Sequence, residues 1–165
     1  MSFRCSVCGE LHDALPHVGS DRPDQYWDVA EEDRERRVEL TDDTCIIDGE
    51  HFFIRGVIEI PVHDYPDGFG FGVWVSQKRE NFEAYVTEPA SGEIGPFFGW
   101  LCTRIAFYPR DTMLLKTRAH FRGGGLRPAI ELEPTDHPLA VDQREGITLR
   151  KALEIVHFYS DDHPT

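Results

Sequence analysis

The sequence predicts an α+β fold, a single domain with a mostly antiparallel sheet. Three observations lead to this prediction. Two hairpin patterns follow one another along the chain, helical patterns lie in the middle and at the C-terminal end, and strands and helices do not alternate as in parallel βαβ units. Within the 165 residues we expect an N-terminal segment, residues 1–16, and an α+β core, residues 44–159.

The first helical pattern is short and polar. It runs from about Ala30 to Leu40, with acidic residues first and arginines last, an order that suits the helix dipole. Because the whole run is charged, we interpret it as a solvated helix face without a binding role.

The first hairpin is predicted by a turn signal between two apolar runs. Asp48 and Gly49 tolerate the positive φ angles of a type I′ turn, and a second strand begins at His51 and stops at Pro61. If the turn has two residues, Ile46 pairs with His51. Cys45 then faces the opposite side of the sheet from that histidine.

The next strand is predicted over residues 69–76, where aromatic and β-branched residues alternate with small ones. Its glycines do not form a phosphate loop, because a strand rather than a helix follows them. A short helix is then expected over residues 77–86, with Phe82 and Tyr85 facing inward.

A second hairpin and a terminal helix complete the fold. Residues 112–121 and 128–132 flank three consecutive glycines, Gly123–Gly125, which predict a flexible turn between two strands. The final helix covers about residues 148–159, where apolar side chains recur at helical spacing, and Thr148 is its predicted N-cap.

These elements predict one core. Trp74 and Val75 are neighbours on a strand and point to opposite faces, so burial of both requires the sheet to be covered on two sides. We expect the following side chains to be largely buried in that core: Ile46, Phe53, Ile58, Trp74, Val75, Leu132, Leu153 and Val156.

The composition excludes several function classes. With 17 basic and 30 acidic residues the formal net charge is −13, which argues against a general nucleic-acid-binding surface. The start of the sequence does not resemble a signal peptide, and no segment approaches the length of a membrane span. We therefore expect a cytoplasmic protein without membrane contact, whose four cysteines are reduced thiols or metal ligands.

The most specific local motif is a zinc-knuckle-like turn, Cys5-Ser6-Val7-Cys8-Gly9. Two thiolates at this spacing can face one metal ion, and a structural zinc site needs four ligands. Cys45 is the best third candidate. For the fourth ligand we prefer His12, with His17 and His51 as alternatives.

Two other interpretations of Cys5 and Cys8 stay open. A redox pair normally lies at a helix N-terminus in a βαβ unit, and that context is missing here. The two cysteines can also be ordinary small buried thiols. Cys102 is expected to be a core residue.

Positive charge is concentrated in one part of the chain. Residues 101–130 contain six bases and one acid, a net charge of +5, which leaves −18 for the other 135 residues. Arg118, Arg122 and Arg127 could grip an anion together, with His137 nearby. The competing interpretation is that the arginines pair with acids of the same chain, and that His137 only orders a turn.

With these residues in hand, the chain resembles the bacterial proteins grouped as domain of unknown function 2199. The resemblance is carried by residues 3–9 with His12, and by residues 45–56, 72–76 and 126–148. The family pattern includes positions that match Cys5, Cys8, His12, Cys45 and His51, so the resemblance is compatible with a metal site. It implies no activity or mechanism.

We expect a small binding or interaction protein with a structural zinc ion, whose partner is a basic protein or a small anionic ligand. The alternative is an enzyme that acts on a small anionic substrate held by the arginines. A concave site where arginines and a histidine converge would favour the enzyme. Arginines paired within the chain would favour the binding protein.

Overall fold

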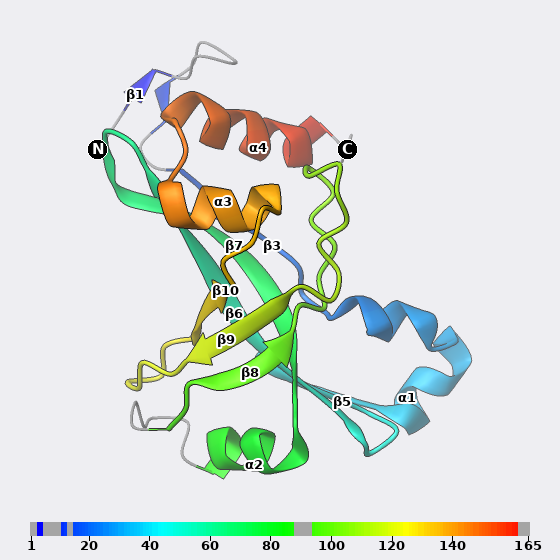
Figure 1. Cartoon of the computed structure of the whole chain (residues 1–165). Coiled ribbons are helices and arrows are strands. Elements are labelled where there is room, and N and C mark those ends of the chain that lie inside the picture. Colours follow the sequence, from blue (N-terminus) through cyan, green and yellow to red (C-terminus); the bar gives the residue numbers. More distant parts are fainter. Residues whose placement is uncertain (1–2, 5–10, 13–14, 88–93, 162–165) are drawn as a thin grey trace.

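The computed structural model describes residues 3–4, 11–12, 15–87 and 94–161. It confirms an α+β fold with a mostly sheet core and a C-terminal helix (Figure 1). The strands are β1 (Phe3–Arg4), β2 (Leu11–His12), β3 (Val18–Gly19), β4 (Val38–Leu40), β5 (Thr44–Ile47), β6 (His51–Val62), β7 (Tyr65–Gln77), β8 (Phe97–Trp100), β9 (Lys116–His120) and β10 (Ala129–Leu132). The helices are α1 (Arg34–Arg37), α2 (Arg79–Thr87), α3 (Pro138–Glu145) and α4 (Leu149–Asp161), and 3-10 turns cover Asp24–Asp28 and Glu31–Asp33. In the described part of the chain, none of the helices has the length and apolar character that a membrane span requires.

A long antiparallel hairpin, β6 with β7, is the centre of the structure. Its strands have 12 and 13 residues, and they reverse direction at a turn in which Asp64 has a φ of 64°. The predicted stop at Pro61 is wrong, because β6 continues to Val62. The register shifts between Ile60 and Val62, and such an irregularity accommodates a proline without a ladder hydrogen bond.

The other strands extend this hairpin into a curled sheet. The order is β3-β7-β6-β10-β9-β8, and β5 adds to the free part of β6. The β3–β7 and β10–β6 pairs are parallel and the remaining pairs are antiparallel. Curling brings β8 back beside β7: Leu101 bridges Val75, and the Cys102 N–H donates to the Trp74 carbonyl at 2.8 Å.

Both faces of the central hairpin are buried, as predicted. Val75 lies in the larger apolar cluster, inside the curled sheet and under α2, α3 and α4. Trp74 faces the other way and is fully buried in a smaller cluster with Cys45 and Phe53, which the segment before β5 covers. The prediction of one core is therefore wrong, since the sheet separates two clusters. Ile46 and Val156, which we expected in the core, are partly buried at the edge of the larger cluster.

The observed helices agree only in part with those predicted from the sequence. α2 buries Phe82 and Tyr85 as predicted, and Thr148 caps α4 by accepting the Lys151 N–H at 3.1 Å. The predicted helix over 30–40 is wrong beyond Arg37, because residues 38–40 form β4 against β5. α3 was not predicted; its first turn begins at a proline, Pro138.

The first hairpin differs from its prediction by one residue. Asp48 and Gly49 have the positive φ angles of a type I′ turn, but Glu50 adds a residue to the loop. His51 therefore pairs with Ile47 instead of Ile46. A slip of one residue reverses the facing of side chains, so Cys45 and His51 lie on the same face of the sheet, contrary to our expectation.

Candidate functional site

The N-terminal cysteine motif lies between two paired strands. Cys5 and Cys8 are outside the described residues, and β1 and β2 on either side of them pair antiparallel, with Phe3 opposite His12. The zinc centre itself stays a prediction.

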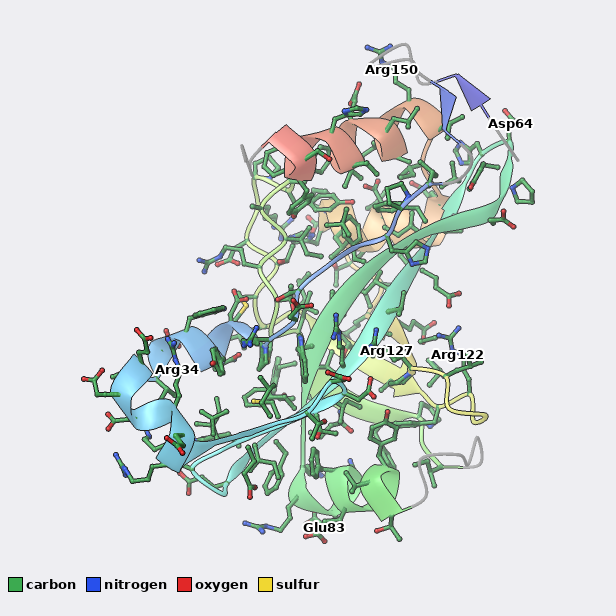
Figure 2. All side chains as sticks on the ribbon, turned by 180° about the vertical axis from the view of Figure 1, so that it is seen from behind. Arg34, Asp64, Glu83, Arg122, Arg127 and Arg150 are labelled. Atoms are coloured by element: carbon green, nitrogen blue, oxygen red, sulfur yellow. The ribbon has the colours of Figure 1, made fainter. Side chains whose placement is uncertain are left out.

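Cys45, the predicted third zinc ligand, lies in an apolar environment. It is fully buried in the smaller apolar cluster, and burial raises the pKa of its thiol to about 11. β5 lies near the opposite end of the molecule from β1 in both views (Figures 1 and 2). Within the described ranges, no three His, Cys, Asp or Glu side chains form a group that could hold a metal ion.

Arg122 and Arg127 are engaged within the chain. Arg122 forms an ion pair with Glu59, and two of its nitrogens donate to the Arg127 carbonyl at 2.7 and 3.0 Å. Arg127 pairs with Asp43 at 2.8 Å. Figure 2 shows both arginines on the loop that joins β9 to β10. Their carboxylate partners come from β6 and from the segment before β5.

His137 is buried, with 2% of its surface exposed. Its Nδ1 accepts the Leu139 N–H at 3.0 Å and so caps α3, and its Nε2 lies 3.2 and 3.1 Å from the carbonyls of Arg110 and Asp111. All of these contacts are internal. They join α3 to the loop before β9, and the structure does not bring His137 together with Arg118, Arg122 and Arg127 in a common cleft.

Arg118 lies on the outer side of the curled sheet, in a shallow cavity of about 670 Å³. We call this surface the aromatic–basic face. Phe98 and Trp100 of β8 stand on it edge to face, with ring centroids 5.0 Å apart, and they are 45% and 41% exposed. The face is lined by Phe98, Trp100, Lys116, Arg118, Glu131 and Glu133, together with Thr117, Leu132 and Pro134.

A second cavity, of about 420 Å³, opens where β5, β6 and β7 approach the 3-10 turn before α1. We call it the cleft. Its walls are partly apolar, its rim is acidic, and Trp100 borders both it and the aromatic–basic face. Its lining residues are Gln25, Asp28, Val29, Arg37, Ile47, Asp48, Glu50, His51, Phe52, Phe53, Ser76, Gln77, Trp100, Cys102 and Leu114.

Two glutamine side chains in the cleft have unused acceptors. Gln77 is 8% exposed and donates from Nε2 to the carbonyls of Ser76 at 2.7 Å and Phe98 at 3.1 Å. Because both partners are acceptors, the nitrogen must face them, which fixes the direction of the Oε1 atom. That oxygen has no partner in the described structure, and neither has the Oε1 of Gln25. A buried acceptor without a partner costs about 1–3 kcal/mol, so each oxygen would gain from a donor that reached it.

The thiol of Cys102 forms a hydrogen bond with the side chain of Gln25. It accepts the Gln25 Nε2–H at 3.3 Å and donates to the Trp100 carbonyl at 3.3 Å. Burial raises the pKa of this thiol to about 11, so it is protonated at neutral pH and is not a nucleophile. Its burial agrees with the predicted core position.

The rim of the cleft carries more acid than base. Arg37 forms a two-pronged ion pair with Asp48 at 2.7 and 2.8 Å, and this hydrogen bonding holds the pKa of Asp48 below its usual value. Asp28 and Glu50 add two more carboxylates, while His51 is exposed beside Glu50. The site can thus accept hydrogen bonds and positive charge.

Sequence reasoning missed the residues that make the cleft. Gln25, Gln77 and Trp100 lie far apart in the chain, and none belongs to a recognisable motif. They meet because the sheet curls and brings β8 back to β7, which the spacing of turn residues does not reveal. The exposed pattern of β8, with two aromatic side chains on its outer face, was the one local signal available.

Comparisons with known proteins give one match. A family model described as "Uncharacterized protein conserved in bacteria (DUF2199)" matches residues 4–147. No curated protein and no solved structure matches the chain. The matched range contains the cleft, the aromatic–basic face and the N-terminal cysteines.

Proposed function

The chain belongs to the DUF2199 family of uncharacterised bacterial proteins, and we propose that it is a binding protein whose cleft receives a basic group of a partner. The observation that carries this proposal is the pair of buried glutamine oxygens without hydrogen-bond partners beside an acidic rim. An ammonium or guanidinium group has donors and no acceptors, and it complements both features.

The shape and charge of the protein support the same proposal. The apolar walls, which include Val29, Ile47 and Leu114, suit the aliphatic stem of a lysine or arginine side chain. The net charge of −13 attracts a basic partner over a longer range. Gln25 is partly exposed, so a small rotation can present its oxygen to the bound group.

The alternative, an enzyme that grips an anionic substrate, has less support. Two of its three arginines, Arg122 and Arg127, already have carboxylate partners, and His137 uses both ring nitrogens internally. A substrate would have to displace these contacts before it could bind.

Titration with a single basic group tests the proposal. We expect N-acetyl-arginine amide to shift the side-chain amide NMR signals of Gln25 and Gln77, whereas the neutral analogue N-acetyl-citrulline amide binds more weakly. The variant Asp28→Asn/Glu50→Gln should weaken arginine binding about fivefold, since an exposed charge contact contributes up to ~1 kcal/mol.

The matched control is Asp64→Asn/Asp67→Asn. It removes the same charge at the far turn of the β6–β7 hairpin (Figure 2), whereas the cleft lies at its open end. Equal binding of arginine and citrulline probes, or equal weakening by both variants, would contradict the proposal.

We also propose that Cys5 and Cys8 hold a structural zinc ion. The Cys-x-x-Cys-Gly spacing and the pairing of β1 with β2 around it support this proposal. The burial of Cys45 in an apolar cluster favours histidines, His12 with His17, over that cysteine as the other ligands.

Elemental analysis of the untagged protein should find about one zinc per chain. Cys8→Ser should lose the metal and lower the melting temperature, because zinc binding is coupled to folding. Cys45→Ser should keep the metal if histidines complete the site, and should lose it if Cys45 is a ligand. Metal-free protein from metal-replete growth would overturn the proposal.

A further inference from the structure

The six bases in the positive segment, residues 101–130, differ in whether they have a carboxylate partner. Four of its six bases have a carboxylate partner: Arg104 with Asp111, Arg110 with Asp136, Arg122 with Glu59 and Arg127 with Asp43. Among the described residues, Lys116 and Arg118 have no carboxylate within ion-pair distance. Two neighbouring cations that have no ion-pair partner in the described part of this acidic chain are available to an external anion.

These two cations stand beside the exposed aromatic pair. In the β8–β9 register Trp100 lies opposite Lys116 and Phe98 opposite Arg118, so all four side chains share the outer side of the sheet. Glu131 and Glu133 line the face from β10, on the other side of β9. Glu131 is the cross-strand neighbour of Arg118, but its carboxylate lies 3.0 Å from His120 and does not form an ion pair with Arg118. On the β8 side the described lining residues are aromatic and not acidic, so an anion that approaches from that side meets Lys116 and Arg118 before the two glutamates.

Trp100 joins this face to the cleft, because it lines both cavities. The cleft has an acidic rim and unused acceptors, and the aromatic–basic face has two cations that lack an ion-pair partner within the described ranges. An exposed aromatic side chain between sites of opposite charge suits a ligand that carries both charges.

We propose that the partner of this protein is a peptide segment with a basic residue and a nearby carboxylate, which crosses Trp100 from the cleft to the aromatic–basic face. This inference rests on the proposed function, since the cleft holds the basic residue. Lys116 and Arg118 bind the carboxylate, and Phe98 and Trp100 pack against the chain between the two charges.

The experiment uses peptides of the form acetyl-Arg-(Gly)n-Glu-amide, with a spacer that grows from one glycine to four, and matched peptides that end in Gln. Calorimetry on the full chain should show one spacer at which the Glu peptide binds about three- to tenfold more tightly than its Gln partner, as expected for exposed charge-assisted contacts. Added salt should reduce this preference.

Lys116→Gln/Arg118→Gln should abolish the Glu preference and leave the binding of N-acetyl-arginine amide unchanged. The control Arg104→Gln/Arg110→Gln, with the same charge change at two paired arginines, should keep the preference. If Glu and Gln peptides bind equally at every spacer while the arginine amide still binds better than citrulline, the inference is wrong and the proposed function stands. If the arginine amide does not bind, both are wrong.

Discussion

A buried polar network between α3, α4 and the loop before β9 provides a quantitative test of the structure. The carboxylate of Asp142, 8% exposed, accepts the Tyr108 hydroxyl at 2.7 Å and lies 2.6 Å from Lys151 Nζ. Burial and the bond to Asp142 both raise the pKa of Tyr108, so the phenol stays a donor. We expect Asp142→Asn to weaken the network without creating a cavity.

The loss of stability expected for Asp142→Asn follows from the contacts of Asp142 with Tyr108 and Lys151. The Tyr108 hydroxyl can still donate to the amide oxygen, but a neutral bond is about half as strong as a charge-assisted one, a loss of about 1 kcal/mol. Lys151 is partly exposed and regains water, so its ion pair contributes at most ~1 kcal/mol. The free energy of unfolding should fall by about 1–2 kcal/mol.

Urea denaturation of a double-mutant cycle checks this reasoning. In a Tyr108→Phe background, Asp142→Asn should cost less, with a coupling energy of about 0.5–1.5 kcal/mol. Asp136→Asn, at a carboxylate whose side chain is 88% exposed, is the matched control and should change stability by less than about 0.5 kcal/mol. An Asp142→Asn protein as stable as the wild type would refute the assigned network.

Three further predictions concern the fold. Thr148→Ala should lower the free energy of unfolding by about 1 kcal/mol in urea denaturation, because it removes the cap of α4, and Thr148→Ser should restore most of it. Gly56→Ala should lower the free energy of unfolding by about 1–3 kcal/mol, because the added Cβ would lie 2.6 Å from the Ile130 side chain. A melting temperature within a degree of the wild type would contradict this close approach. Stability should fall as pH rises from about 8.5 to 11, because unfolded thiols ionise near 8.5 while Cys45 and Cys102 hold their protons up to about 11 in the fold. Urea denaturation at a series of pH values should show that the free energy of unfolding falls less steeply with pH in Cys45→Ala/Cys102→Ala than in the wild type. Equal slopes for the two proteins would argue against the raised pKa values.

The sequence predicted those parts of the fold in which a local pattern and its environment agree. The hairpin turn at Asp48, the inward side chains of α2 and the cap at Thr148 are decided within a few residues of one another. Strand alternation placed Trp74 and Val75 on opposite faces, and both are buried as expected. These elements need no knowledge of what packs against them.

The errors arise where distant contacts decide the outcome. Residues 38–40 continue a helical pattern, but pairing with β5 makes them a strand. One extra loop residue, Glu50, reversed the expected facing of Cys45 and His51. For the arginines, composition could not say which would find acidic partners, because Glu59 and Asp43 reach Arg122 and Arg127 from distant parts of the chain.

The return of β8 to β7 also bears on whether a second chain can pair with the edge of β8. The outer strand of a sheet normally offers unpaired N–H and C=O groups to which a second chain can add. Here the Trp100 N–H donates to the Ser76 hydroxyl at 3.0 Å, and the Phe98 carbonyl accepts from Gln77. Some backbone groups on this edge of the aromatic strand β8 are therefore already paired with its own neighbour, β7, which limits edge-to-edge growth there. Loss of the Gln77 amide would free that edge, and the damage would be visible first as aggregation instead of unfolding.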